Sequence, residues 1–285
     1  MKYITLILLF VVTTLTAQKT EKKLEKELQA LVKDFNGQIG FYIHNLRTNR
    51  VAVYNADTIF PTASIVKVPI MIGIMDKIQK GELSYHQSLI YKDSLLYEGE
   101  DILGSYKNNE KVELSKVLML MLTTSDNTAS LWLQSLAGKG TRINEILDTL
   151  GFANTRVNSR TPGRETKRNI YGWGQTTPKE MASLMQKIVS GEVINKEMSD
   201  KMIRLMGRNY WDEEGLSQIP AGVFVASKNG AVNASRSELM YVNHPKNPFI
   251  ISIFTKNNKD ISWGVNNEAW TLTRKIVKAI WEFYQ

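Results

Sequence analysis

Cysteine is absent from the 285-residue sequence, and histidine occurs only three times. Without cysteine the chain has no disulfide bonds, no thiolate metal ligands and no cysteine nucleophile. The histidines, His44, His86 and His244, are widely separated in the sequence, which argues against a histidine-rich metal site and gives little support to a histidine-based catalytic triad. Any catalysis is therefore expected to depend on serine, lysine, carboxylate or tyrosine side chains.

Long hydrophobic runs are also absent after the first seventeen residues. Residues 1–17 combine a positive start at Lys2, an apolar run over 4–12 and a small-residue end at Ala17, which is the layout of a secretory signal peptide. The apolar run is short for a membrane span, and a lipoprotein anchor would need a cysteine. We expect a periplasmic or secreted protein of residues 18–285 without stable membrane insertion; an uncleaved N-terminal anchor is the alternative.

The chain has an excess of basic residues, with 36 Lys and Arg against 28 Asp and Glu and a net charge of +8. These residues are spread along the sequence, and no nucleic-acid-reading motif accompanies them, so we expect no nucleic-acid partner. The charged fraction of 22% and aromatic fraction of 9% are typical of globular proteins. The length suits one large domain or two closely joined ones.

Hydrophobic periodicity predicts an α+β fold. Period-two patterns predict two groups of strands, at 38–45 and 50–55 and at 223–227, 238–243 and 249–255. Helical patterns precede, separate and follow these groups, at 20–36, from Ile65 to Gly81, in two segments of 112–137, at 141–150, from Thr177 and at 266–284. We expect the terminal helices to cover one antiparallel sheet and the central helices to form a second lobe.

The predicted lobes place a cleft between them, and such clefts are common sites. The α/β lobe would comprise about 18–62 and 218–285, and the helical lobe about 63–217. Residues 152–175 are polar, rich in glycine and arginine, and show little periodicity. Because they are too long for an idle connection, we predict a functional loop there.

Three short motifs carry the candidate chemistry: Ser64-Ile65-Val66-Lys67, Ser125-Asp126-Asn127 and Lys228-Asn229-Gly230. Residues three apart on a helix share a face, so the Lys67 amine should reach the Ser64 hydroxyl. A serine hydroxyl needs a neighbouring base to become a strong nucleophile, and lysine is such a base only if burial or nearby positive charge keeps it neutral. The apolar helix and Lys228 would supply both conditions. Each motif alone is weak, but the three in this order are strong; the alternative for Ser64 is a plain helix N-cap.

With these motifs, the chain resembles class A β-lactamases and related penicillin-recognising serine hydrolases over about residues 22–284. The supporting stretches include FPTASIVKVPI, LMLTTSDNTASLWL and VFVASKNG. The resemblance implies a β-lactamase/transpeptidase-like fold in which Ser64 is the acylated nucleophile and Lys67 accepts its proton. It also implies that Ser125 passes a proton to the leaving nitrogen.

The same resemblance implies a set of substrate-binding residues. Asn127 would bind the substrate amide, and Lys228 would hold the substrate carboxylate and tune Lys67 and Ser125. The remaining members of this set are Asn229, Gly230, Ala231 and Arg236. The backbone N–H groups of Ser64 and Ala231 would form the oxyanion hole. Arg236 resembles a carboxylate-binding arginine, but a register shift of one residue would point it to the other face of its strand.

The sequence departs from the family pattern in its third motif and its long loop. Asn229 stands where the family has Thr or Ser; its amide can also donate a hydrogen bond, but it is longer. The family's loop carries Glu-x-x-x-Asn, which positions the hydrolytic water. The ungapped register, which we prefer, places Thr161 at the Glu position and Glu165 at the Asn position, whereas a gapped register matches Glu165 and Asn169. Residues that would form the family's loop-stapling ion pair are replaced by Ser159 and Gly174.

The sequence therefore predicts a serine hydrolase that acts through an acyl-enzyme, with β-lactam hydrolysis as the best single activity. We expect a monomer that needs no metal and no cofactor. If Glu165 reaches the hydrolytic water, the enzyme turns over; if it is a solvated loop charge, the adduct persists. The alternatives are a penicillin-binding DD-peptidase or esterase acting on cell-wall peptides, a β-lactam or muropeptide-binding protein without turnover, and a structural envelope protein.

Overall fold

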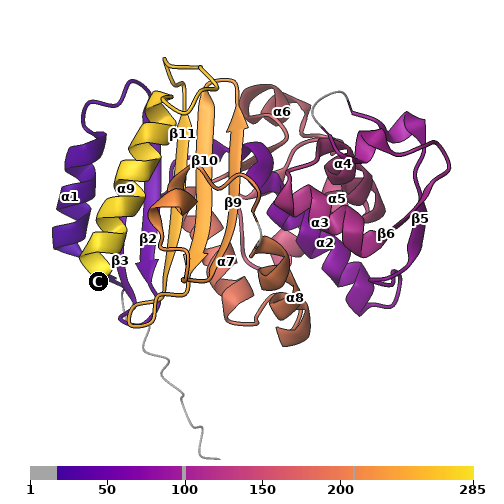
Figure 1. Cartoon of the computed structure of the whole chain (residues 1–285), viewed down its shortest axis with the longest axis horizontal. Coiled ribbons are helices and arrows are strands. Elements are labelled where there is room, and N and C mark those ends of the chain that lie inside the picture. Colours follow the sequence, from indigo (N-terminus) through magenta and orange to yellow (C-terminus); the bar gives the residue numbers. More distant parts are fainter. Residues whose placement is uncertain (1–17, 98–100, 208) are drawn as a thin grey trace, which may run out of the picture.

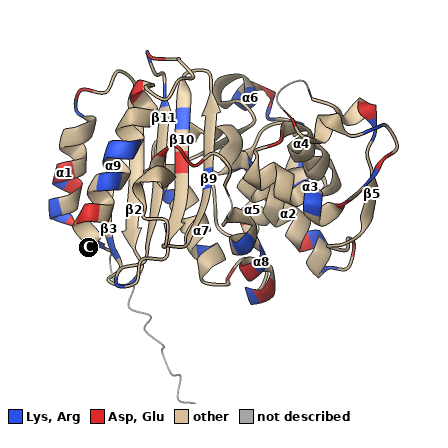
Figure 2. Ribbon diagram, in the orientation of Figure 1, with Lys and Arg blue, Asp and Glu red and all other residues tan. Residues whose placement is uncertain are grey.

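The computed structural model describes residues 18–97, 101–207 and 209–285. The predicted signal peptide, residues 1–17, lies outside the described residues. Within the described ranges, none of the helices has the length and apolar character needed to cross a membrane. Basic and acidic residues are distributed over most elements of the ribbon (Figure 2), in keeping with their spread along the sequence.

A six-stranded sheet organises the molecule (Figure 1). Its spatial order is β1 (Lys19–Thr20), β3 (Arg50–Tyr54), β2 (Gln38–Asn45), β11 (Phe249–Lys256), β10 (Ser235–Val242) and β9 (Val225–Val232). The pair β1–β3 is parallel and every other neighbouring pair is antiparallel. Because β2 pairs with β11, both predicted groups of strands join in one sheet, and β9 becomes an edge strand.

One face of the sheet is covered by the two terminal helices, α1 (Lys22–Val32) and α9 (Glu268–Tyr284), as predicted (Figure 1). Their apolar residues form one core cluster with residues of β2, β10 and β11. Leu24 and Leu28 are buried in it, but Leu31, which has the predicted helical spacing, is 37% exposed and Val32 is buried instead. The helix thus presents a narrower stripe to the sheet than the leucine spacing suggests.

The other face packs against α7 (Pro178–Val189) and the central helices, which share a second core cluster. This block contains η1 (Ala63–Val66), α2 (Lys67–Gln79), α3 (Leu114–Thr123), α4 (Asn127–Leu136), α5 (Lys139–Thr149) and α8 (Lys196–Met206). The predicted apolar helix, the break between α3 and α4, and the Thr177 helix start are all confirmed. The division into lobes near residues 63 and 217 stays a prediction.

The remaining elements are short. Two small sheets contain β4 (Phe60–Pro61), β8 (Gly174–Thr176) and β7 (Arg156–Val157) in one, and β5 (Ser88–Ile90) and β6 (Lys111–Glu113) in the other. Three further short helical turns are η2 (Asp93–Leu95), η3 (Leu103–Ser105) and η4 (Gly215–Gln218).

Three features differ from the sequence predictions. The segment 152–175 is not a plain loop, because it contains β7, β8 and the helix α6 (Glu165–Tyr171). The strand β9 does not end at 228–230 but continues through these residues to Val232. Helix α8 was not predicted, although its buried methionines recur at helical spacing and the Asn195 side chain caps its N-terminus.

The exposure difference on α1 gives a stability test. Leu28→Ala should lower the free energy of unfolding by about 2–5 kcal/mol, because it leaves a cavity in the cluster between α1, α9 and the sheet. Leu31→Ala, three residues along the same helix but 37% exposed, is the matched control and should cost about 1 kcal/mol or less. Urea unfolding of both variants measures the difference, and equal losses would contradict this packing.

Candidate active site

The amine of Lys67 is the centre of the predicted constellation. Ser64 lies in the turn η1, and Lys67 begins helix α2 directly after it. The Lys67 Nζ lies 3.1 Å from Ser64 Oγ, 3.0 Å from Ser125 Oγ and 2.8 Å from Asn127 Oδ1. It also donates to the Ser125 backbone carbonyl. One buried amine therefore touches both hydroxyls and the amide of the first two motifs.

Two carboxylates fix the turn that carries Ser125 and Asn127. Asp126 is buried and caps α4, accepting from the N–H of Ala129 at 2.7 Å and of Leu103 at 2.8 Å. Asp101 accepts from the N–H groups of Asn127 at 2.9 Å and of residue 128 at 2.7 Å. Ser125 itself has a φ of 63°, which is an uncommon conformation for a residue with a side chain. The two carboxylates stabilise this turn, and Asp101 carries no sequence signal that links it to the motifs.

The edge strand β9 closes the other side of the site. A Cβ atom at Gly230 would lie 2.7 Å from the Ser64 backbone nitrogen, so only glycine permits this approach. The close contact brings the adjoining Ala231 backbone beside the N–H of Ser64. Lys228 is fully buried, and its Nζ donates to the Asn229 carbonyl at 2.8 Å and to Asn229 Oδ1 at 3.4 Å.

Burial changes the protonation of both lysines. It lowers the pKa of Lys67 well below the ordinary value of 10.5, and the charge of Lys228 lowers it further against the opposing effect of Asp101 and Asp126. Burial also lowers the pKa of Lys228 to about 7, with Glu238 acting in the opposite direction. A lysine amine with a depressed pKa is available as a proton acceptor near neutral pH.

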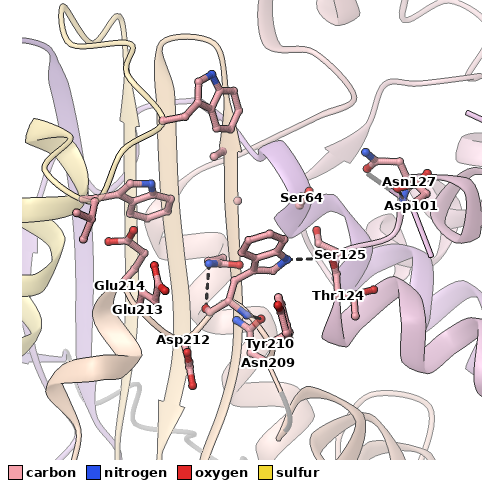
Figure 3. A pocket seen from close by; sticks show the side chains of 17 residues that line it. Ser64, Asp101, Thr124, Ser125, Asn127, Asn209, Tyr210, Asp212, Glu213 and Glu214 are labelled. Carbon is pink, nitrogen blue, oxygen red and sulfur yellow. Dashed lines mark hydrogen bonds between the residues drawn. The ribbon is translucent and has the colours of Figure 1, made fainter. Parts of the chain in front are cut away.

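A cavity of about 1000 Å³ lies over these groups (Figure 3). Six of the predicted site residues line it: Ser64, Ser125, Asn127, Asn229, Gly230 and Ala231. In Figure 3, Ser64, Ser125 and Asn127 lie on one side of the cavity and Glu213 and Glu214 on the other. Lys67 and Lys228 lie beneath this surface, each with no exposed area.

Arg236 does not point into this cavity, in contrast to the prediction. The two-residue turn between β9 and β10 pairs Arg236 with Ala231 and places Ser237 opposite Gly230. Arg236 therefore shares a strand face with Met240, which packs in the cluster under α9. Its guanidinium is held by three backbone carbonyls and an indole ring, those of Asn233, Ser235, Ser262 and Trp263.

Glu165 also lies outside the cavity. It begins α6, its side chain is exposed, and its Oε1 accepts from the N–H of Gly163 at 3.2 Å. Thr161, the residue at the same position in the ungapped register, is buried and donates to the carbonyls of Val157 and Ser159. Among the described residues of 152–175, none lines the cavity.

Other contacts hold this segment in place of the missing ion pair. The Glu180 carboxylate accepts from the N–H groups of Ala153, Asn154 and Thr155. Ser159 donates to the buried Gln134 at 3.0 Å. At Gly174, a Cβ atom would lie 2.6 Å from Thr62 Oγ1, so the strand β8 needs glycine to pack beside η1.

Sequence reasoning missed residues 209–214, which line the cavity from the connection after α8. Trp211 donates from Nε1 to the Thr124 carbonyl at 2.9 Å and accepts from Asn229 Nδ2 at 3.2 Å through its own carbonyl. The segment follows an unpredicted helix and carries no motif, so its place in the site arises only from the fold.

Comparisons with known proteins agree with this geometry. Residues 23–284 match the model of a family described as the β-lactamase enzyme family. The chain is similar to β-lactamase VEB-1 of Pseudomonas aeruginosa, with 23% identity over 99% of this chain and 98% of the relative. It is similar to β-lactamase SME-1 of Serratia marcescens, with 26% identity over 82% of each.

Solved structures show the same fold. A structure of PBP-A in an acyl-enzyme complex with penicillin G has a TM-score of 0.82 and 23% identity, covering 94% of this chain and 98% of that one. The TLA-1 extended-spectrum β-lactamase has a TM-score of 0.82 and 20% identity, covering 92% and 98%.

The buried Lys228 gives a pH test of this site. Its pKa is about 7 in the folded protein and 10.5 when exposed, so between these values the unfolded chain binds more protons. The free energy of unfolding should therefore rise with pH across this window, by at most about 1.4 kcal/mol per pH unit. Lys228→Met removes this contribution, so the stability advantage of the variant over the wild type should shrink as the pH rises from about 7 towards 10.5.

Urea unfolding across this pH range measures the difference. Lys107→Met, at an exposed lysine, is the matched control and should follow the wild type. A Lys228→Met profile parallel to the wild type would contradict the depressed pKa.

Proposed function

The chain belongs to the β-lactamase enzyme family and is a serine β-lactamase-like hydrolase, and from this premise we propose that Ser64 is acylated by the β-lactam ring. The observation that carries the proposal is the single buried amine of Lys67, which contacts the hydroxyls of both Ser64 and Ser125. Its depressed pKa supports a role as the base.

In the proposed acylation, the neutral Lys67 amine takes the Ser64 proton as Ser64 Oγ attacks the β-lactam carbonyl carbon. The carbonyl oxygen becomes an oxyanion, which the N–H groups of Ser64 and Ala231 stabilise. When the carbon–nitrogen bond breaks, Ser125 gives its proton to the leaving nitrogen and Lys67 returns a proton to Ser125. The contacts of Lys67 with both hydroxyls support this proton path, because each transfer is between hydrogen-bonded atoms.

The remaining predicted residues have binding roles in this proposal. Asn127 presents its amide at the cavity wall and binds the substrate amide, while Lys228 and the β9 backbone at Gly230 face the leaving-group side. Arg236 has no role, because its guanidinium lies on the other face of β10.

We propose that deacylation is slow. The carboxylate predicted to position the hydrolytic water, Glu165, is exposed on α6 and does not line the cavity. Without a carboxylate near the ester, an acyl-enzyme is expected to persist, and this favours the alternative of a penicillin-binding enzyme with a long-lived adduct. The fold shared with PBP-A, whose acyl-enzyme complex with penicillin G is known, is consistent with this alternative.

The setting of this reaction is also a proposal. We propose that residues 1–17 direct export, so that the protein acts as a monomer in the periplasm or outside the cell. There it would meet β-lactams and cell-wall peptides, both of which present an acyl carbon bonded to nitrogen.

The acylation test combines intact mass after exposure to penicillin with a chromogenic cephalosporin assay. The wild type should gain the mass of one penicillin, and Ser64→Ala should gain none. Lys67→Ala should lower the acylation rate constant by about 10²–10⁴-fold, because it removes the base. Lys77→Ala, on the same helix but outside the cavity, is the matched control. An adduct on Ser64→Ala would contradict the nucleophile assignment.

The deacylation test uses Glu165→Gln. Because this carboxylate is exposed and bonded to its own helix turn, the variant should release the penicilloyl adduct at the wild-type rate, within about twofold. The rate is measured from the decay of adduct mass after removal of free penicillin. A tenfold slower release would place Glu165 on the hydrolytic water and sink the proposal of slow, carboxylate-free deacylation.

A further inference from the structure

Residues 209–211, here called the bridging segment, connect the two walls of the catalytic cavity. Trp211 donates from Nε1 to the Thr124 carbonyl at 2.9 Å, and its own carbonyl accepts from Asn229 Nδ2 at 3.2 Å (Figure 3). The two neighbouring residues repeat this pattern. The Tyr210 N–H donates to the Thr123 carbonyl at 3.0 Å, and Asn209 Nδ2 donates to Ser227 Oγ at 3.3 Å.

The walls joined by this segment enclose the leaving-group side of the site. The leaving nitrogen must lie within reach of Ser125 Oγ to receive its proton. Substituents on that nitrogen therefore extend from Ser125 towards the edge strand at Asn229. Trp211 is bonded to the residue before Ser125 and to Asn229, so its side chain spans the space that these substituents would enter.

The contacts of Asn229 show that the segment is held in this place. Its Nδ2 donates to Trp211, and its Oδ1 accepts from Lys228 Nζ at 3.4 Å. Both ends of the carboxamide are thus bonded within the protein. Trp211 nevertheless remains 45% exposed, so the indole is a wall of the cavity with open space on its outer side and is not part of the core.

We propose that Trp211 is a specificity-determining residue that selects substrates by the width of their leaving group. Narrow, acyclic leaving groups pass under the indole, whereas a nitrogen carried in a fused ring must break the bonds of Trp211 to Thr124 and Asn229. The inference rests on the proposed acylation of Ser64. It explains why an asparagine, longer than a serine or threonine, is accommodated at position 229.

The test compares two substrates with the same phenylacetylamino acyl half and different leaving groups. One is a thioester that releases thioglycolate, and the other is a cephalosporin, whose nitrogen is part of a six-membered ring. Trp211→Ala should raise the acylation rate constant of the cephalosporin, relative to that of the thioester, by about tenfold or more. Trp211→Phe keeps a ring but loses the bond to Thr124, and it should raise this ratio by a smaller factor.

Phe224→Ala is the matched control, because Phe224 is exposed to a similar degree, 41%, but does not line the cavity. It should leave the ratio unchanged, and thermal unfolding should show that all variants are folded. An unchanged ratio in Trp211→Ala, or a ratio that falls, would overturn the inference while leaving acylation intact. Failure of the wild type to form an adduct with either substrate would instead refute the proposed function, and this inference with it.

Discussion

The site depends on one desolvated amine. Lys67 has no exposed area, and the fold gives its Nζ three side-chain partners on two elements. A charged ammonium in this place would lose its hydration and lie near a second buried lysine, so the neutral form is favoured. The arrangement converts a residue that is ordinarily an acid at neutral pH into a base. Without that burial, the hydroxyl of Ser64 would have no proton acceptor.

The surrounding structure keeps this amine in register with its partners. Helix α2 is buried along most of its length and carries Lys67 into the core. The turn before α4 is held by two carboxylates, Asp101 and Asp126, that bind backbone N–H groups and leave the side chains of Ser125 and Asn127 free for the site. These contacts order the site before any substrate arrives, which reduces the reorganisation needed during reaction.

The local parts of this arrangement could be predicted from the sequence, and the long-range parts could not. Ser64 and Lys67 are three residues apart on one helical turn, so their contact follows from helix geometry. The position of Arg236 depends on the length of the turn after β9, where one residue decides which face of the strand it occupies. Trp211 reaches the site only because distant segments meet in space, and no local pattern encodes such a meeting.

The approach of β9 to Ser64 limits how this enzyme could diversify. Since a side chain at position 230 would collide with the backbone nitrogen of Ser64, natural variation at that position is closed to any residue larger than glycine. The bridging segment is under no such steric limit at its exposed outer side. Adaptation to new substrates is therefore expected to accumulate in residues 209–211, where changes reshape the entrance and leave the reacting groups undisturbed.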